Sequence, residues 1–229
     1  MTTVLILPLC CPLCETPFEG RQAASTDGFG PLTTDLRRLS AGEDPLPSLV
    51  HTCPGCGFTA GEGPWTGAAA SLPGDSAEAG TTRAALLARV RAELGTATQG
   101  WDAALRYEAA ARCAEWVGQG ALPQADHWLR AAWMHEDRGR AEDGTRCRWE
   151  ASRRYGAALK EPGRFQRLQD AVVVTYLAGE LQRRLGNPDQ ARDLFHQVGQ
   201  LAQGRPDLRS LVALAERQAT SPGNYVPEG

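Results

Sequence analysis

Cys11-Pro12-Leu13-Cys14 and Cys53-Pro54-Gly55-Cys56-Gly57 decide how the first part of this 229-residue chain folds. Two residues between the cysteines of a pair let both thiolates face one ion, at Zn–S distances of about 2.3 Å. Proline after the first cysteine stiffens each turn, and Gly57 allows the left-handed backbone that such a knuckle uses. Glu15 stands where the first pair would have its glycine. We therefore predict that Cys11, Cys14, Cys53 and Cys56 together bind one zinc ion.

Four thiolates leave no open coordination position, so this ion would be structural and would not act as a Lewis acid. The 38 residues between the pairs exceed the spacing of about 15–20 typical of such sites, so the spacer must contain an excursion. Two other ligand sets remain open, with Cys10 replacing Cys11 or His51 replacing a thiolate. Both fit poorly, because Cys10 lacks the two-residue spacing and His51 lies two residues before Cys53. The C-P-x-C form also occurs in thiol redox enzymes, so a zinc-linked redox sensor is a further alternative.

The segment around the two motifs, residues 1–64, is rich in turns and shows no helical periodicity. We predict strands at 4–7 and 49–52, a turn at 27–31, and one or two helical turns at 33–39. Because this segment has few apolar residues, a bound ion must supply much of its stability as a small zinc ribbon. We expect the ribbon and the helical part to bury separate cores, so that Ser in place of Cys53 or Cys56 would unfold the ribbon alone.

From residue 81 onward the pattern becomes helical, and the fold class is predicted to be mainly α. Thr81 or Thr82 caps the first helix, which stops near Gly95. Short connections between the helices favour antiparallel neighbours. The predicted organisation is a ribbon domain at 1–64, a linker at 65–80, a TPR-like helical domain at 81–219 and a flexible tail at 220–229. Seven helices are expected, at 81–94, 101–118, 123–137, 143–160, 164–185, 188–202 and 206–219.

One pattern of small and large residues recurs in the helices. A small residue on one helix lets the next helix cross closely, and a small-large-small stripe on that next helix fills the groove. This arrangement, displaced by 66 residues, resembles the tetratricopeptide (TPR) repeat of about 34 residues. The unit between the two copies is degenerate, so a plain α-bundle is the alternative. The matching positions are Cys113, Ala125, Leu129 and Ala132, and Gly179, Ala191, Phe195 and Val198.

Charge disfavours nucleic-acid binding by the ribbon. Residues 1–80 contain three arginines against nine acidic residues, and zinc-bound thiolates would add negative charge. Glu142 and Glu150 precede two of the helical arginines by four residues, so pairing on the helix surface accounts for part of the basic cluster. An anion- or nucleic-acid-binding surface made by this cluster is the alternative to a solvated face. Its members are Arg146, Arg148, Arg153, Arg154, Arg183 and Arg184.

Catalysis and export are both disfavoured. The sequence has no nucleophile elbow, P-loop or G-x-G-x-x-G motif, so we expect no enzyme activity. It has no lysine or arginine before Arg21 and no long apolar run, which disfavours a signal peptide or a membrane span of the usual kind. The cysteines then belong in a reducing cytoplasm. A helical face lined with aromatic residues and arginines would suit a peptide.

The motifs together resemble a bacterial family of unknown function. Its members join a CPxC/CPxCG zinc-ribbon-like region to a TPR-like helical half, and residues 129–133, 179–186, Ala191 and Phe195 match its helical part. Glu15 departs from the glycine that the family tends to show. The resemblance implies a cytoplasmic protein with a zinc site at the four cysteines and no established activity. We therefore expect an interaction or adaptor protein with an unidentified protein or peptide partner, and nucleic acid is the less favoured partner.

Overall fold

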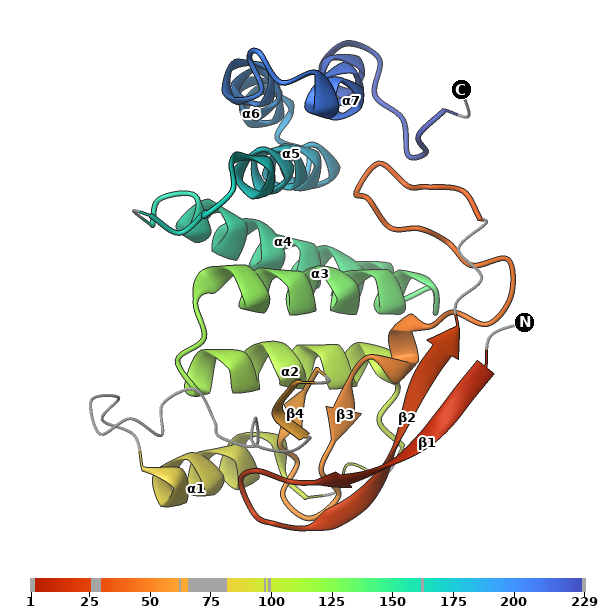
Figure 1. Cartoon of the computed structure of the whole chain (residues 1–229), viewed down its shortest axis with the longest axis vertical. Helices are drawn as coiled ribbons and strands as arrows, with labels where there is room; N and C mark the ends of the chain where they lie inside the picture. Colours follow the sequence, from red (N-terminus) through yellow and green to blue (C-terminus); the bar gives the residue numbers. More distant parts are fainter. Residues whose placement is uncertain are drawn as a thin grey trace. The chain divides into compact units, whose positions relative to one another are not determined.

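The computed structural model describes residues 3–25, 30–61, 63–65, 82–96, 98, 100–161 and 163–227. Within these ranges the chain is mainly helical, as predicted, with seven α-helices and two small two-stranded sheets (Figure 1). No helix there is both long enough and apolar enough to cross a bilayer. Each predicted helix is present, with its ends shifted by a few residues. The helices are α1 (Arg83–Leu94), α2 (Ala103–Trp116), α3 (Ala121–Glu136), α4 (Ala141–Ala158), α5 (Leu168–Arg184), α6 (Pro188–Leu201) and α7 (Arg209–Thr220).

The chain divides into two compact units. The first comprises Met1–Asp27 and Gly42–Cys147, and the second comprises Gly28–Ala41 and Arg148–Gly229. The long spacer between the cysteine pairs therefore contains the predicted excursion, because residues 28–41 belong to the second unit. The predicted linker, apart from Trp65, lies outside the described residues, as does most of the predicted turn at 27–31. The predicted domain limits at 64 and 81 thus stay a prediction.

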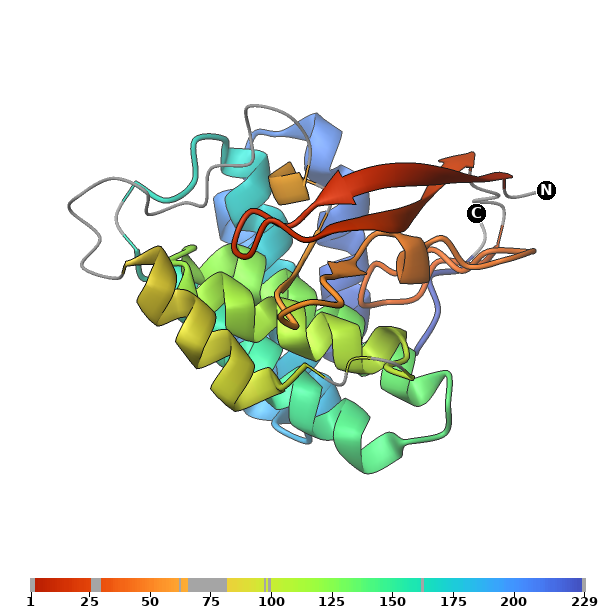
Figure 2. The ribbon, with the colours of Figure 1, turned by 90° about the horizontal axis from the view of Figure 1, so that it is seen from below.

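Two β-hairpins form the ribbon in the first unit. Strand β1 (Thr3–Cys10) pairs antiparallel with β2 (Pro17–Ser25), and β3 (His51–Thr52) pairs antiparallel with β4 (Thr59–Ala60). The predicted strands at 4–7 and 49–52 overlap β1 and β3. Strands β2 and β4 were missed, because β2 lacks apolar alternation and β4 has only two residues. Each cysteine pair lies in the turn of one hairpin, and Figure 2 shows the β1–β2 turn beside α1.

The hairpins share one apolar core with α1 and α2. Phe58 follows the second cysteine pair and is buried with Leu86 and Val90 of α1. Trp65 is only 3% exposed, and its ring lies 5.3 Å from that of Phe18 and 5.5 Å from that of Phe58. The expectation of separate cores is therefore wrong. A ribbon with few apolar residues completes its core with the apolar faces of two helices.

The residues of the repeating pattern are buried in two helix hairpins. Seven residues of the pattern are at most 3% exposed: Cys113 on α2, Ala125, Leu129 and Ala132 on α3, and Ala191, Phe195 and Val198 on α6. In the second hairpin, a Cβ on Gly179 of α5 would lie 2.9 Å from a ring carbon of Phe195 on α6. The absence of a side chain at Gly179 therefore lets α5 and α6 cross closely, as the pattern predicts.

Residues 30–41 form a turn, and the expected helix at 33–39 is wrong. Leu32 bridges to Arg38, and the amide of Thr33 donates to the carbonyl of Arg37 at 2.8 Å. Leu36 has a left-handed backbone with φ 63°. The Thr33 hydroxyl donates to Asp35 at 2.6 Å, a local hydrogen bond that competes with helix formation.

The segment after α7 is hydrogen-bonded to this turn. Thr33 bridges to Tyr225, the Thr34 amide donates to the carbonyl of Asn224 at 3.0 Å, and the Val226 amide donates to the carbonyl of Leu32 at 2.8 Å. Residues 221–227, which composition predicts as a flexible tail, thus pair with a segment far away in sequence. These contacts lie within the second unit.

Candidate metal centre

The four cysteines of the two knuckles converge. Their Sγ atoms all lie within 4.8 Å of one another, with 3.7 Å between Cys11 and Cys56 and 3.5 Å between Cys14 and Cys53. These distances are too long for disulfides, whose S–S bond is about 2.05 Å, and all four thiols are free. A tetrahedron with metal–sulfur distances of about 2.3 Å has edges of roughly 3.8 Å. The sulfur positions therefore fit one tetrahedral ion, and this donor set suits zinc.

The two knuckles have the same backbone hydrogen bonds. The amides of Cys11 and Cys53 donate to the carbonyl five residues later, at 3.0 and 2.8 Å. Their carbonyls accept from the amide four residues later, at 2.9 Å in both cases. Each turn thereby points its two thiols to the same side, and the pairs approach from two separate hairpins.

The difference between Glu15 and Gly57 has a steric cause. Both residues have left-handed backbones, with φ 62° and 83°. A Cβ on Gly57 would lie 2.5 Å from the carbonyl oxygen of Gly95, so glycine is needed there. The Glu15 side chain is exposed and accepts a hydrogen bond from Arg83 at 3.0 Å. The first knuckle therefore keeps its geometry without glycine.

Burial and mutual hydrogen bonding determine the charge of the cluster. Cys11, Cys53 and Cys56 are fully buried, and Cys14 is half-buried. Hydrogen bonds from Cys11 and Cys56 lower the pKa of Cys53, whereas hydrogen bonding with Cys53 and burial raise the pKa of Cys11. Hydrogen bonding with Cys11 and Cys53 also raises the pKa of Cys56. Without a metal ion, ionisation of Cys53 is therefore favoured over ionisation of Cys11 and Cys56. Ionisation of all four thiols requires a cation at the centre of the cluster.

The two alternative ligands lie outside the cluster. Cys10 is exposed at the end of β1, and its sulfur is 3.6 Å from the carbonyl oxygen of Glu15. The buried His51 ring packs against Gly20 and lies 6.3 Å from the Trp65 ring. The cluster therefore consists of the four cysteines with the two-residue spacing.

A comparison with protein families extends this description. The family described as uncharacterized protein conserved in bacteria (DUF2225) matches residues 8–220. The chain belongs to this family. The DUF2225 match includes all four clustered cysteines and all seven helices. Neither the curated proteins nor the solved structures give a match to this chain.

In this DUF2225 chain, each of the six arginines named from sequence has an acidic partner. Arg146 pairs with Glu108 at 2.7 Å and with Asp143 at 3.2 Å, instead of with Glu142 as expected. The expected pair of Arg154 with Glu150 is present, and Arg153 shares that carboxylate. The remaining three, Arg148, Arg183 and Arg184, belong to a buried network in the second unit.

That network surrounds two buried carboxylates which sequence reasoning missed. Glu180 is fully buried and accepts from both Arg183 and Arg184 at 2.7 Å. Asp35 is 3.2 Å from Arg148, and the Thr34 hydroxyl donates to Glu180 at 2.6 Å. The i,i+3 and i,i+4 spacing indicates that Glu180 can pair with Arg183 and Arg184 on one helix. It does not indicate that Thr34, 146 residues away in sequence, contacts Glu180. These arginines therefore hold residues 30–41 against α5.

A second cluster of possible metal ligands is buried in the first unit. Glu108, His135 and Cys147 offer donor atoms within 4.8 Å of one another. The Nε2 atom of His135 is 2.6 Å from Glu108, and Arg146 donates to both oxygens of that carboxylate. Since a guanidinium already neutralises Glu108, this cluster fits a structural polar network. His135, near the end of α3, is 1% exposed.

Proposed function

We propose that this DUF2225 chain is a non-enzymatic interaction protein of the cytoplasm. In this proposal one zinc ion, held by Cys11, Cys14, Cys53 and Cys56, joins the two hairpins of the ribbon. When bound, the ion supplies only folding free energy, because four thiolates occupy all its tetrahedral positions. The TPR-like helices of the second unit then present a groove to a protein partner.

An exposed tryptophan in a groove is the observation that supports this proposal most. Trp149 on α4 is 54% exposed, whereas Trp65 and Trp128 are at most 4% exposed. The guanidinium of Arg153 lies 5.7 Å from the centre of the Trp149 ring. Tryptophan and arginine are the residues most enriched in the binding centres of protein interfaces. The groove has a volume of about 300 Å³ and is lined by Trp149, Ser152, Arg153, Gln182, Leu185, Asn187 and Gln190.

The lining indicates the chemistry of the partner. Trp149 offers an apolar face for one aromatic or aliphatic side chain. Arg153 is more than half exposed while paired with Glu150, so it can also pair with an acidic residue of the partner. The amides of Gln182, Asn187 and Gln190 can hydrogen-bond to a peptide backbone. We therefore propose a peptide segment with an apolar residue close to an acidic one.

The other functions have less support. Nucleic-acid binding needs several arginines that can reach phosphates. Four of the six candidates, Arg148, Arg154, Arg183 and Arg184, have side chains at most 17% exposed and are paired with carboxylates. Catalysis needs accessible groups, but burial raises the pKa of the Cys113 thiol to about 12 and lowers that of His127 to about 4. A redox sensor needs exposed thiolates, and three of the four clustered sulfurs belong to fully buried residues.

A peptide display library tests the proposal. Selection against the full chain should enrich peptides that have an apolar residue near an acidic one. Trp149→Ala should weaken their binding by more than about tenfold, as expected for a central aromatic residue. Leu201→Ala is the matched control, because Leu201 is an exposed apolar residue of the same unit that does not line the groove. Peptides that bind Trp149→Ala as tightly as the unchanged chain, or enrichment of RNA alone in a pull-down, would overturn the proposal.

A further inference from the structure

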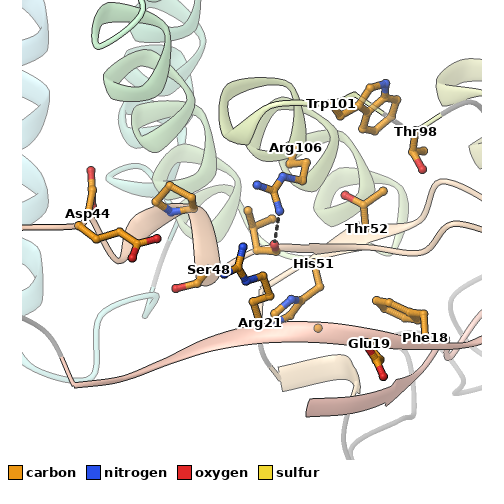
Figure 3. A pocket seen from close by; sticks show the side chains of 14 residues that line it. Phe18, Glu19, Arg21, Asp44, Ser48, His51, Thr52, Thr98, Trp101 and Arg106 are labelled. Atoms are coloured by element: carbon orange, nitrogen blue, oxygen red, sulfur yellow. Dashed lines mark hydrogen bonds between the residues drawn. The ribbon is translucent and has the colours of Figure 1, made fainter. Parts of the chain in front are cut away.

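A second cavity lies in the first unit, apart from the metal centre and the Trp149 groove. It has a volume of about 410 Å³, within the range that small-molecule sites occupy. Strand β2 contributes Phe18–Arg21, the segment before and within the 3-10 helix η1 (Leu46–Ser48) contributes acidic and hydroxyl groups, and β3 contributes His51 and Thr52. Trp101, which precedes α2, and Arg106 of α2 complete the wall (Figure 3).

Arg106 has fewer hydrogen bonds than a guanidinium in such a position requires. Its Nε atom is buried without a hydrogen-bond partner among the described residues. Its Nη1 atom donates to the carbonyl of Val50 at 3.5 Å, a long contact that Figure 3 marks. The nearby Asp102 is already paired with Arg140 at 2.6 Å and Arg138 at 3.4 Å. Burial lowers the pKa of Arg106 although Tyr107 and Asp102 favour its charged form, so its charge is only partly compensated in the free protein.

Arg21 provides a second positive charge in the same cavity. Figure 3 shows Arg21 extending from β2, and Arg106 from α2, into the space beside His51. Arg21 has no ion pair with any residue that the structure describes. Gly20 leaves room for the His51 ring, because a Cβ there would lie 3.1 Å from Nδ1 of His51. The hydroxyls of Thr52 and Thr59 are hydrogen-bonded to each other at 3.0 Å, which holds the Thr52 side chain in place at the cavity wall.

The acidic residues of the cavity limit what can bind. Glu19, Glu43 and Asp44 also line it, and Asp44 accepts a hydrogen bond from the amide of Leu46 at 2.9 Å. These carboxylates would repel a nucleic-acid backbone. They allow a compact anion whose other end carries hydrogen-bond donors. Phe18 and Trp101 supply apolar walls.

We propose that this cavity binds a small molecule bearing a carboxylate or phosphate, with its oxygens held by Arg106 and Arg21. The guanidinium groups donate hydrogen bonds to the anion. The acidic rim accepts hydrogen bonds from hydroxyl or ammonium groups of the same molecule. This site is separate from the peptide groove and does not depend on the proposed function.

Calorimetric titration of the full chain at low ionic strength, with phosphoethanolamine and with β-alanine as probes, tests the proposal, because each probe carries an ammonium group for the acidic rim. We expect saturable binding of at least one probe, because screening is weak at low salt. Arg106→Gln and Arg21→Gln should each weaken it by more than about tenfold, as expected for loss of charge-assisted hydrogen bonds. Arg91→Gln removes the same charge from an exposed position of α1 and should leave the affinity within about twofold.

Each outcome decides between ligand classes or against the site. Binding of phosphoethanolamine alone indicates a phosphate ester, and binding of β-alanine alone indicates a carboxylic acid. Binding of neither probe, or equal weakening in all three variants, would overturn the proposal. Arg21 is exposed and makes no described ion pair, so Arg21→Gln keeps the test valid if Arg106→Gln does not fold.

Discussion

Gly57→Ala should destabilise the ribbon strongly, although alanine adds only a methyl group. The backbone of Gly57 is left-handed with φ 83°, which costs roughly 1–2 kcal/mol for a residue with a side chain. The new Cβ would also lie 2.5 Å from the carbonyl oxygen of Gly95, and forced repacking of this kind costs about 1–3 kcal/mol. The expected loss in unfolding free energy is therefore roughly 2–5 kcal/mol.

Urea denaturation followed by tryptophan fluorescence measures this loss, because Trp65 is buried in the same core. The first knuckle offers a matched control, since Glu15 already has a left-handed backbone with φ 62°. Glu15→Ala removes only an exposed ion pair with Arg83 and should cost less than about 0.5 kcal/mol. Glu15→Gly should stabilise the chain by about 1 kcal/mol, because glycine adopts this conformation without strain. The reasoning is refuted if Gly57→Ala is as stable as the unchanged chain, or if Glu15→Ala is equally damaging.

Three further predictions concern the core, a buried carboxylate and a partly buried histidine. Removing metal with a chelator should speed amide hydrogen exchange in α1 as well as in the ribbon, because α1 and the ribbon share one core. Unchanged exchange in α1 would contradict a shared core. Glu180→Ala removes the buried carboxylate that Arg183 and Arg184 share and should cost about 3–5 kcal/mol in urea denaturation. Asp189→Ala in an exposed pair should cost less than about 1 kcal/mol, and similar losses would count against the network. Burial lowers the pKa of His127 from 6.5 to about 4, so stability should fall as the pH drops from 6.5 to 4, by roughly 3 kcal/mol from this group. His127→Gln should flatten that fall and His196→Gln at an exposed position should not, as thermal denaturation across this pH range will show.

The helices could be predicted from sequence because their signals are local. Thr82 caps α1 through a hydrogen bond from the amide of Ala85, and Gly95 ends it with φ 71°. Pro188 begins α6, and glycines with positive φ follow several other helices. The cysteine pairs were equally readable, because the two-residue spacing is itself the geometry of the knuckle.

The remaining features depend on contacts between residues far apart in sequence. Trp65 seemed to start a linker, yet it is buried against Phe18 and Phe58. Residues 33–39 were expected to form a short helix, but Thr34 hydrogen-bonds to Asn224 and Glu180, which are far away in sequence. Spacing along one helix could not show which carboxylate would be buried or which arginine would line a cavity. These contacts form only in the tertiary structure, so they cannot be predicted from composition or local sequence pattern.

The zinc content of the purified chain tests the central claim most directly. We predict one zinc ion per chain, because the distances between the four free sulfurs fit a single tetrahedral site. Elemental analysis of protein prepared under reducing conditions gives this ratio. Protein that is folded yet contains no zinc, or in which Cys14 and Cys53 are joined by a disulfide, would contradict the account.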